Sequence, residues 1–264
     1  MPAVSKSPVA LVTGASRGIG RAIAQKLAAR DLRVAVHYHR NRALAEGVLA
    51  SLPGTGHALF QADLADPAAC AGLIAAVKKK FGRLDVLVNN AGRYEDHDPR
   101  KVSFAGWKKS WQRTIDANLT GPAHLAYLAA QLMVRQQAGA EGETAFGRGR
   151  IINITSRGAF RGEPTAPAYG ASKAALNSFG QSLAKALAPD RIYVYAIAPG
   201  WVDTDMAKAS LTGPNRAEVM AQHPLGRVAT PGEVADTAAW LALDAPATMT
   251  GCIIDINGAS YLRT

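Results

Sequence analysis

A tyrosine and a lysine stand four residues apart, in the sequence Tyr169-Gly-Ala-Ser-Lys173. Side chains at positions i and i+4 share one face of a helix, so the phenol and the ammonium would be neighbours. A positive charge beside a phenol favours the phenolate, and we expect it to lower the tyrosine pKa from ~10. Such a tyrosine would donate or accept a proton near neutral pH. An ordinary surface pair is the alternative, because this spacing is common.

A serine is the third group with the right chemistry. Ser156 follows the apolar run Ile151-Ile-Asn-Ile154, which reads as a buried strand. Its hydroxyl could hold the carbonyl oxygen of a substrate beside the phenol, and the three residues together suggest proton transfer to a carbonyl.

Three glycines follow the first apolar run, in Thr13-Gly14-Ala15-Ser16-Arg17-Gly18-Ile19-Gly20. Glycine allows a tight turn and close approach of phosphates to main-chain N–H groups, and the helix that follows presents its positive end. The spacing is neither the common dinucleotide fingerprint nor a P-loop. A turn of this kind between the first strand and the first helix predicts a nucleotide site; a purely structural turn is the alternative.

The second strand indicates which nucleotide is bound. It ends in His37-Tyr-His39-Arg40-Asn41, without the carboxylate that would bind the ribose hydroxyls of NAD. Arg17 and Arg40 could together hold a 2′-phosphate, with His39 and Asn41 as further donors, because guanidinium groups donate paired, charged hydrogen bonds. We therefore expect NADP(H). Solvated charges that cap a helix are the alternative.

The elements that must position these residues alternate between strand and helix. Such alternation predicts parallel strands with right-handed crossovers, and the apolar strands require helices on both faces. We expect one doubly wound Rossmann-type α/β domain over residues 1–264. A glycine-rich surface loop at 136–150 should lie at the amino ends of the strands, far from the chemistry. The expected strands are 9–13, 34–38, 57–61, 84–88, 151–154, 192–198 and 252–256.

Composition narrows the class of protein. The chain has 264 residues and a net charge of +10, which attracts anions such as nucleotides and acidic carrier proteins. The sequence has no apolar run long enough for a membrane span, and no zinc-finger or RNA-recognition signature. The first apolar run begins at Val9, so we expect no signal peptide and a cytoplasmic protein. Cys70 and Cys252 lack metal-ligand spacing and should be buried, inert thiols, and we expect no metal.

Taken together, the motifs resemble those of the classical short-chain dehydrogenases/reductases, over nearly the whole of residues 9–258. Within that family the chain is similar to NADPH-dependent 3-oxoacyl-carrier-protein reductases and to pteridine and carbonyl reductases. The blocks that carry it, in order, are 13–20, Asp63-Leu64, Asn89-Asn90-Ala91-Gly92, Asn118 in Asp-Ala-Asn-Leu-Thr-Gly, Ser156, 169–173 and Pro199-Gly200-Trp201-Val202-Asp203-Thr204.

The resemblance implies a role for each catalytic residue. Ser156 would orient the carbonyl, and Tyr169 would deliver a proton as hydride arrives from the nicotinamide. Lys173 would lower the tyrosine pKa and hold the nicotinamide ribose. Asn118 would hold a water molecule that links Lys173 to a proton relay.

The resemblance also implies which residues line the cofactor site. Asp63 and Leu64 would flank the adenine. The residues alone leave two roles open for Asp63, which could accept from the adenine amine or cap the next helix. The implied cofactor residues are Gly14, Ser16, Arg17, Gly18, Ile19, Gly20, His39, Arg40, Asn41, Asp63, Leu64, Asn90, Ala91, Gly92, Tyr169, Lys173, Pro199, Gly200, Val202 and Thr204.

Two segments depart from the family pattern or vary within it. Residues 93–111 are longer and more charged than in compact members, and either reach the substrate mouth or form a variable surface loop. Residues 204–227 would be the substrate lid, with Met206 either in the pocket or packed inside the lid. The family also implies a homotetramer, or a homodimer, formed by helices around 125–132 and 174–187.

The expected function is therefore NADPH-dependent reduction of a ketone to an alcohol, with 3-oxoacyl thioesters as one candidate substrate. Oxidation of an alcohol, sugar or steroid with NADP, or reduction of a pterin or quinone, is the alternative within the same family. A nucleotide-binding regulatory protein on this fold is a third reading, and the intact tyrosine, lysine and serine count against it.

Overall fold

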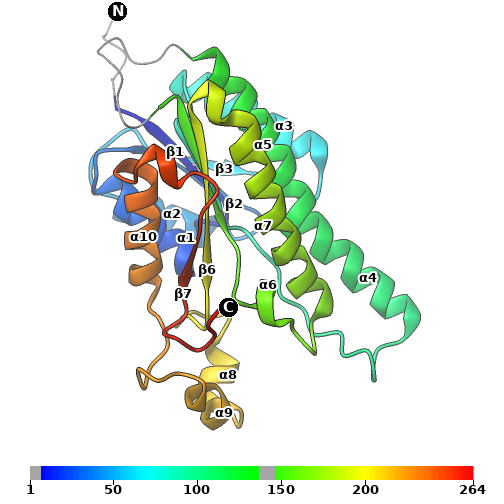
Figure 1. Cartoon of the computed structure of the whole chain (residues 1–264). Coiled ribbons are helices and arrows are strands. Elements are labelled where there is room, and N and C mark those ends of the chain that lie inside the picture. The colour runs from blue at the N-terminus through cyan, green and yellow to red at the C-terminus, as the bar shows by residue number, and fades with distance from the viewer. Residues whose placement is uncertain (1–6, 137–146, 264) are drawn as a thin grey trace, which may run out of the picture.

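The chain is described from a computed structural model that covers residues 7–136 and 147–263. A seven-stranded sheet forms its centre, in the order β3-β2-β1-β4-β5-β6-β7, and every adjacent pair is parallel (Figure 1). The doubly wound Rossmann-type fold class is therefore confirmed. The strands are β1 (Val9–Val12), β2 (Arg33–Tyr38), β3 (Ala58–Gln61), β4 (Val86–Asn89), β5 (Gly149–Ile154), β6 (Ile192–Pro199) and β7 (Ile253–Ile256).

Helices cover both faces of the sheet. In β1, Ala10 and Val12 face one buried cluster and Val9 and Leu11 face the other, so the strand has to be apolar throughout. The first cluster lies under α1 (Gly18–Ala28), α2 (Arg42–Ser51) and α10 (Pro231–Leu243). The opposite layer consists of α3 (Pro67–Phe81), α4 (Phe104–Ile115), α5 (Gly121–Arg135) and α7 (Pro167–Leu187).

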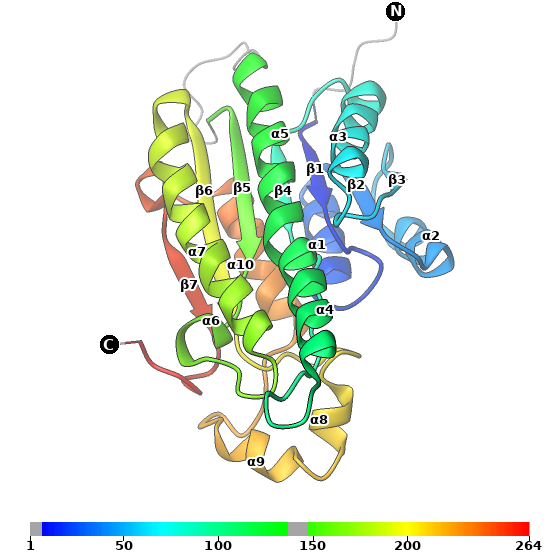
Figure 2. The same cartoon turned by 90° about the vertical axis from the view of Figure 1, so that its right-hand side faces the viewer.

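Short helices gather mainly at the carboxyl edge of the sheet, where ligands bind in folds of this kind. Figures 1 and 2 show α6, α8 and α9 beyond this edge, together with the N-terminal ends of α4 and α7. The short elements are the π-helix η1 (Asp116–Thr120), α6 (Gly158–Arg161), the 3-10 helix η2 (Ala188–Asp190), α8 (Lys208–Thr212), α9 (Arg216–Ala221) and the 3-10 helix η3 (Ala247–Met249).

Residues 93–111 are not a loop throughout, which corrects one reading of the sequence. Helix α4 begins at Phe104, and the Ser103 side chain caps it by accepting from the N–H of Gly106 at 3.2 Å. Its aromatic residues, Phe104, Trp107 and Trp111, recur at helical spacing, which is a helix signal that their charged neighbours obscure.

Most of the segment 136–150 lies outside the described residues, so its expected loop is not described. Its end belongs to β5, which begins at Gly149, two residues before the expected strand. Among the described residues, no helix combines the length and apolar character that a membrane crossing demands.

Candidate active site

The structure brings the catalytic candidates together at the carboxyl edge of the sheet. Lys173 donates from Nζ to the carbonyl oxygen of Ile154 at 2.8 Å, and the same Nζ lies 5.8 Å from the centre of the Tyr169 ring. The Ser156 side chain lies close enough to the Tyr169 phenol to lower its pKa. These groups come from the end of β5 and the start of α7, so the expected grouping of serine, tyrosine and lysine is present.

The pKa of Tyr169 differs from the expectation for a tyrosine beside a lysine. Burial raises the pKa of Tyr169 to about 12, although the side chain of Ser156 acts in the opposite direction, and the nearby carboxylate of Glu163 adds to the rise. Burial also lowers the pKa of Lys173 to about 8. The expected lowering of the tyrosine pKa by its lysine is therefore wrong for the protein on its own, because desolvation of the phenolate is the largest cause of the shift and Lys173 is not among its causes.

Asn118 lies in η1, between α4 and α5, and is fully buried. Its Nδ2 donates to the carbonyl oxygen of Arg93 at 2.9 Å and to the hydroxyl of Ser172 at 3.1 Å, while its Oδ1 accepts from the N–H of Arg93 at 2.7 Å. A methyl group added at Gly92 would lie 3.5 Å from Nζ of Lys173 and 3.6 Å from this Oδ1. Asn118 and Lys173 therefore face the same small region. The water-holding role of Asn118 stays a prediction.

The π turn that holds Asn118 has a local cause. Pro122 has no N–H, so it cannot make the bond that would join it to Asn118 in an α-helix. The helix widens instead, and Gly121 donates to the carbonyl oxygen of Asp116, five residues back. Such π turns occur often at functional sites.

The glycine turn, residues 13–20, has a backbone conformation and close contacts that side chains at its glycines would disturb. Gly14 and Gly18 have φ angles of 62° and 54°, in the left-handed region that favours glycine. The place of a side chain at Gly20 is taken by the carboxamide of Asn90, which donates to the carbonyl oxygen of Thr13 at 2.8 Å. Arg17 is the N-cap residue of α1 and provides no side-chain acceptor for its N–H groups. The positive end of α1 thus suits a phosphate group.

His37, which contacts this turn, is a residue that sequence reasoning missed. It is buried, and its Nδ1 accepts from the N–H of Gly14 at 3.1 Å, so its Nε2 carries the proton and donates to the carbonyl oxygen of Ala62 at 3.2 Å. Burial lowers its pKa to about 4, so the ring is neutral. A histidine within an otherwise apolar strand was the available signal. His37 joins the glycine turn to the end of β3.

The candidates for a 2′-phosphate lie around the end of β2. Arg17 and Arg40 are exposed, and His39 pairs with Asp63, with 3.4 Å between Nε2 and Oδ2. Asn41 caps α2, because its Oδ1 accepts from the N–H of Leu44 at 3.0 Å. The capping alternative thus holds for Asn41, and any phosphate contact would come from its amide nitrogen.

The capping alternative fails for Asp63. Asp66 caps α3 instead, by accepting from the N–H of Ala68 at 2.8 Å. One oxygen of Asp63 accepts from the N–H of Ala65 at 3.0 Å within the turn. Asp63 therefore lies at the end of the β3 region without holding a helix end. The adjacent Leu64 is buried, and its carbonyl oxygen fills the place of a side chain at Gly121.

The remaining cofactor candidates lie after β4 and β6. The N–H groups of Asn90 and Ala91 both donate to Oγ1 of Thr13, at 2.9 and 3.0 Å. A methyl group at Gly18 would touch the methyl of Thr204 at 3.4 Å, so the segment after β6 meets the glycine turn. Ser16 and Ile19 lie in the segment 13–20. Pro199 is the last residue of β6, and the N–H of Gly200 donates to the carbonyl oxygen of Ile256. Val202 forms an isolated parallel bridge with Ala229.

The expected lid, 204–227, contains α8 and α9 beyond the carboxyl edge (Figure 1). Ala207 and Val219 are buried and anchor it, whereas Met206 is 60% exposed. Met206 is therefore not packed inside the lid.

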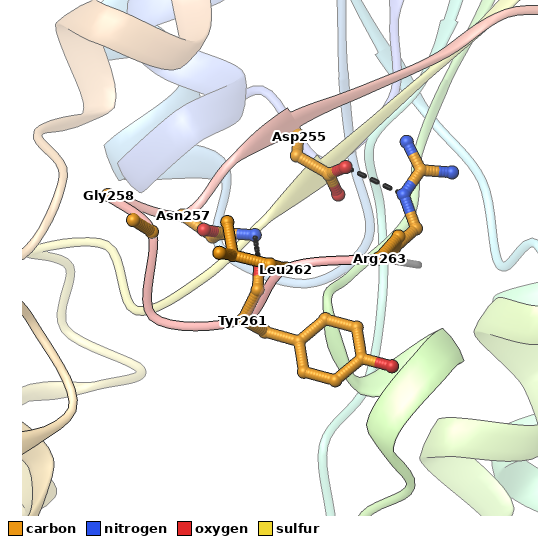
Figure 3. Close-up of a pocket in the computed structure, with 7 residues that line it drawn as sticks. Asp255, Asn257, Gly258, Tyr261, Leu262 and Arg263 are labelled. Atoms are coloured by element: carbon orange, nitrogen blue, oxygen red, sulfur yellow. Dashed lines mark hydrogen bonds and ion pairs between the residues drawn. The ribbon is translucent and has the colours of Figure 1, made fainter.

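Two hollows lie near this edge. The larger, of about 560 Å³, is formed by the C-terminal tail, where Arg263 pairs with Asp255 and Asn257 donates to the carbonyl oxygen of Tyr261 (Figure 3). None of its seven lining residues belongs to the predicted site. The smaller, of about 260 Å³, is lined by α6, the following loop and the first turns of α7, including Gly170 beside Tyr169.

Cysteine and metal chemistry find no support among the described residues. No group of three or more histidine, cysteine, aspartate or glutamate side chains in that part of the chain could hold a metal ion. Cys70 is buried, which raises its pKa to about 11, and Cys252 is partly buried. The expectation of a buried thiol is confirmed for Cys70 and holds only in part for Cys252.

Comparisons with known proteins agree with this geometry. A family model described as Enoyl-(Acyl carrier protein) reductase matches residues 14–259. The 3-oxoacyl-[acyl-carrier-protein] reductase of Synechocystis sp. is 38% identical over 257 residues, which cover 96% of this chain and 97% of that protein. The enzymes of the same name from Staphylococcus aureus and Escherichia coli are 37% and 35% identical, over 96% of this chain and 98% and 97% of their own lengths. The chain therefore belongs to the short-chain dehydrogenase/reductase family of oxidoreductases, which act on carbonyl and alcohol groups.

Proposed function

We propose that this enzyme reduces the ketone of a 3-oxoacyl thioester to the alcohol, with NADPH as the reductant. The observation that carries the proposal is that the side chains of Ser156 and Tyr169 lie together beside the buried ammonium of Lys173. The names of the relatives support the thioester as substrate.

The glycine turn fits a dinucleotide. Gly14 and Gly18 adopt the positive φ angles that shape the turn at the start of α1, where a pyrophosphate would bind. Gly20 lets Asn90 pack closely against this turn, and Gly92 leaves room beside Lys173. Arg17 and Arg40 supply two exposed guanidinium groups for a 2′-phosphate, and no carboxylate ends β2. When bound, NADPH supplies the hydride.

The side chains of this chain would handle the proton. A ketone oxygen placed between the hydroxyls of Ser156 and Tyr169 accepts two hydrogen bonds, which polarise the carbonyl. As the carbonyl carbon gains the hydride, the Tyr169 O–H bond breaks and its proton goes to the oxygen, so that a 3-hydroxyacyl thioester forms. The charge left on the Tyr169 oxygen is stabilised by the ammonium of Lys173, since opposite charges within this range favour the ionised phenol.

The same pair of hydroxyls argues for ketones over enoyl substrates, which the description of the matched family model names. Two donors that converge on one oxygen suit a reaction that protonates that oxygen, whereas reduction of a carbon–carbon double bond delivers its proton to carbon. Crotonyl thioester is therefore the comparison substrate for acetoacetyl thioester.

The direct test is turnover. The purified enzyme with NADPH and acetoacetyl thioester should consume NADPH, and it should do so far faster than with crotonyl thioester. Diketones, quinones and pterins, together with alcohols, sugars and steroids tested with NADP, cover the alternatives. Turnover of one of these classes in place of the thioester would overturn the substrate assignment, and no turnover with any of them would overturn the function.

We also propose a homotetramer, or a homodimer, in the cytoplasm. Phe104 on α4 and Tyr127 on α5 are 75% and 62% exposed, so these helices present large side chains that a second copy would cover. The net charge of +10 suits an acidic carrier protein as the donor of the thioester. Light scattering of the purified protein gives the number of subunits, and a monomer at micromolar concentration would contradict this assembly.

A further inference from the structure

The charged segment after β4 reaches the beginning of the helix that carries Tyr169. We call residues 93–97 the 93–97 loop. The N–H of His97 donates to the carbonyl oxygen of Thr165 at 2.7 Å, and the hydroxyl of Thr165 donates to Asp96 at 2.8 Å. The ring of Tyr94 meets the ring of Tyr169 edge-on, with 5.1 Å between their centres. The loop therefore holds the chain just before Tyr169 at several points.

The imidazole of His97 makes the most specific of these contacts. His97 is 2% exposed, and its Nε2 lies 3.1 Å from the backbone nitrogen of Ala168, whose N–H donates to it. Nε2 must then be the unprotonated nitrogen, so Nδ1 carries the proton and donates to the carbonyl oxygen of Glu95 at 2.8 Å. The ring also meets Trp107 of α4 edge-on at 5.4 Å. Both nitrogens thus have partners, which fixes the orientation of the ring.

Helix α7 needs this contact because its own N-cap residue cannot supply it. The first N–H groups of a helix lack partners within the helix, and a serine, threonine, aspartate or asparagine at the N-cap usually accepts from one of them. Here the N-cap residue is Ala166, followed by Pro167, and no side chain of the cap accepts a hydrogen bond. His97 accepts the N–H of Ala168 instead, from 71 residues away in the sequence.

We propose that His97 is a positioning residue for the reaction. From the 93–97 loop, its imidazole takes the place of a capping side chain for α7 and fixes the first turn, in which Tyr169 follows Ala168 directly. The same loop begins at Arg93, whose backbone N–H and carbonyl oxygen both bond to the Asn118 side chain. The 93–97 loop therefore ties Asn118 and Tyr169 into one arrangement. His97 acts through Tyr169 and touches no reacting atom. Its effect on turnover rests on the proposed function, whereas its role as a cap does not.

Two substitutions at His97 distinguish the contribution of its hydrogen-bond acceptor from that of the size of its ring. His97→Phe keeps an aromatic ring against Trp107 but removes both nitrogens, whereas His97→Gln offers an oxygen near the position of Nε2. We expect His97→Phe to lower kcat about 10-fold or more, because small displacements of a catalytic group are costly. KM for the thioester and Kd for NADPH should change less than about threefold, because the displaced group takes part in the reaction step more than in binding. His97→Gln should recover most of kcat, because it restores an acceptor for the N–H of Ala168.

His57→Phe is the matched control. His57 also accepts a backbone N–H, from Val34 at 3.0 Å, but at the amino end of β2. Its substitution should leave kcat unchanged. A folded His97→Phe variant that keeps the kcat of the wild type, or a His97→Gln variant no better than His97→Phe, would overturn the proposal.

Two measurements test the cap without activity. Long-range ¹H–¹⁵N spectra of the wild type should show His97 with its proton on Nδ1, and a proton on Nε2 would overturn the proposal whatever the variants do. Hydrogen exchange should show the Ala168 amide protected in the wild type and in His97→Gln but exposed in His97→Phe. If the wild type reduces no carbonyl substrate while these two results hold, the proposed function fails and the cap stands.

Discussion

The ammonium of Lys173 donates to the carbonyl oxygen of Ile154, at 2.8 Å, and this bond joins α7 to the end of β5. Ile154 lies two residues before Ser156, so one hydrogen bond fixes the lysine relative to both hydroxyl-bearing residues. Burial alone lowers the pKa of Lys173, and no carboxylate offsets this effect. The carbonyl oxygen therefore compensates the buried ammonium only in part. The site therefore holds a charge that destabilises the fold.

Replacement of Lys173 by methionine should stabilise the protein at pH 7 while it abolishes turnover. The folded pKa of about 8 lies below the value of 10.5 in an unfolded chain, so the buried charge costs about 3 kcal/mol below pH 8, less about 1 kcal/mol for the lost hydrogen bond. Between pH 8 and 10.5 the unfolded chain binds more protons, and the wild type regains stability. Equilibrium urea unfolding at pH 7 and pH 10 should show the advantage of the variant shrinking. An advantage that stays constant with pH would contradict this.

Replacement of Tyr169 by phenylalanine should remove the proton donor and little else. Proton transfer by a positioned group contributes about 10² to 10⁴ in rate, so kcat should fall by at least 100-fold. Fluorescence titration should give a Kd for NADPH within about threefold of the wild type, because the phenol makes at most one hydrogen bond to it. Ser156→Ala is the companion variant, and it should leave measurable turnover. Substantial activity in Tyr169→Phe would assign the proton to another group.

Replacement of Arg40 by alanine should weaken NADPH much more than NADH. A charged hydrogen bond of this kind contributes about 1.5–3 kcal/mol, which corresponds to about 10- to 100-fold in Kd for NADPH. Arg42 is the matched control, because its guanidinium already pairs with Glu46 at 2.8 Å. Arg42→Ala should leave the preference between the two cofactors intact. Equal losses for NADPH and NADH in Arg40→Ala would remove the 2′-phosphate role.

His37 should make the fold sensitive to acid. Its pKa of about 4 in the folded protein lies below the usual 6.5, so the unfolded chain binds more protons between these values and stability falls as the pH falls through this window. The loss amounts to about 3 kcal/mol at most. His37→Asn keeps an acceptor for the N–H of Gly14 and does not titrate. Urea unfolding from pH 7 to 4.5 should show a flatter dependence in that variant than in the wild type or in His57→Asn.

The fold was largely predictable because its strands are apolar runs between turn residues. The helix α4 was missed because lysines and arginines surround Phe104, Trp107 and Trp111, although the aromatic spacing was there to read. The cap of α3 was assigned to Asp63 as an alternative, although Asp66 directly precedes Pro67, which is the usual order at a helix start.

The candidate site was predictable in its members but not in its energetics. The spacing of Tyr169 and Lys173 says that they share a helix face, but the pKa of each depends on how deeply the surrounding elements bury it. His97 escaped notice because its partner is 71 residues away. The absence of a capping residue before Pro167 was the only local sign that some other part of the chain must supply one.

Because of the π turn at η1, the number of residues between α4 and α5 constrains the geometry of the site more than the identity of those residues does. Such a turn holds about one residue more than the α-helix around it. Loss of one residue within Asp116–Thr120 would remove the extra residue of this turn and rotate α4 by about 100° relative to α5. Trp107 would then leave the imidazole of His97, and Asn118 would leave the backbone of Arg93, so a single deletion here would disable the site while the sheet remained intact.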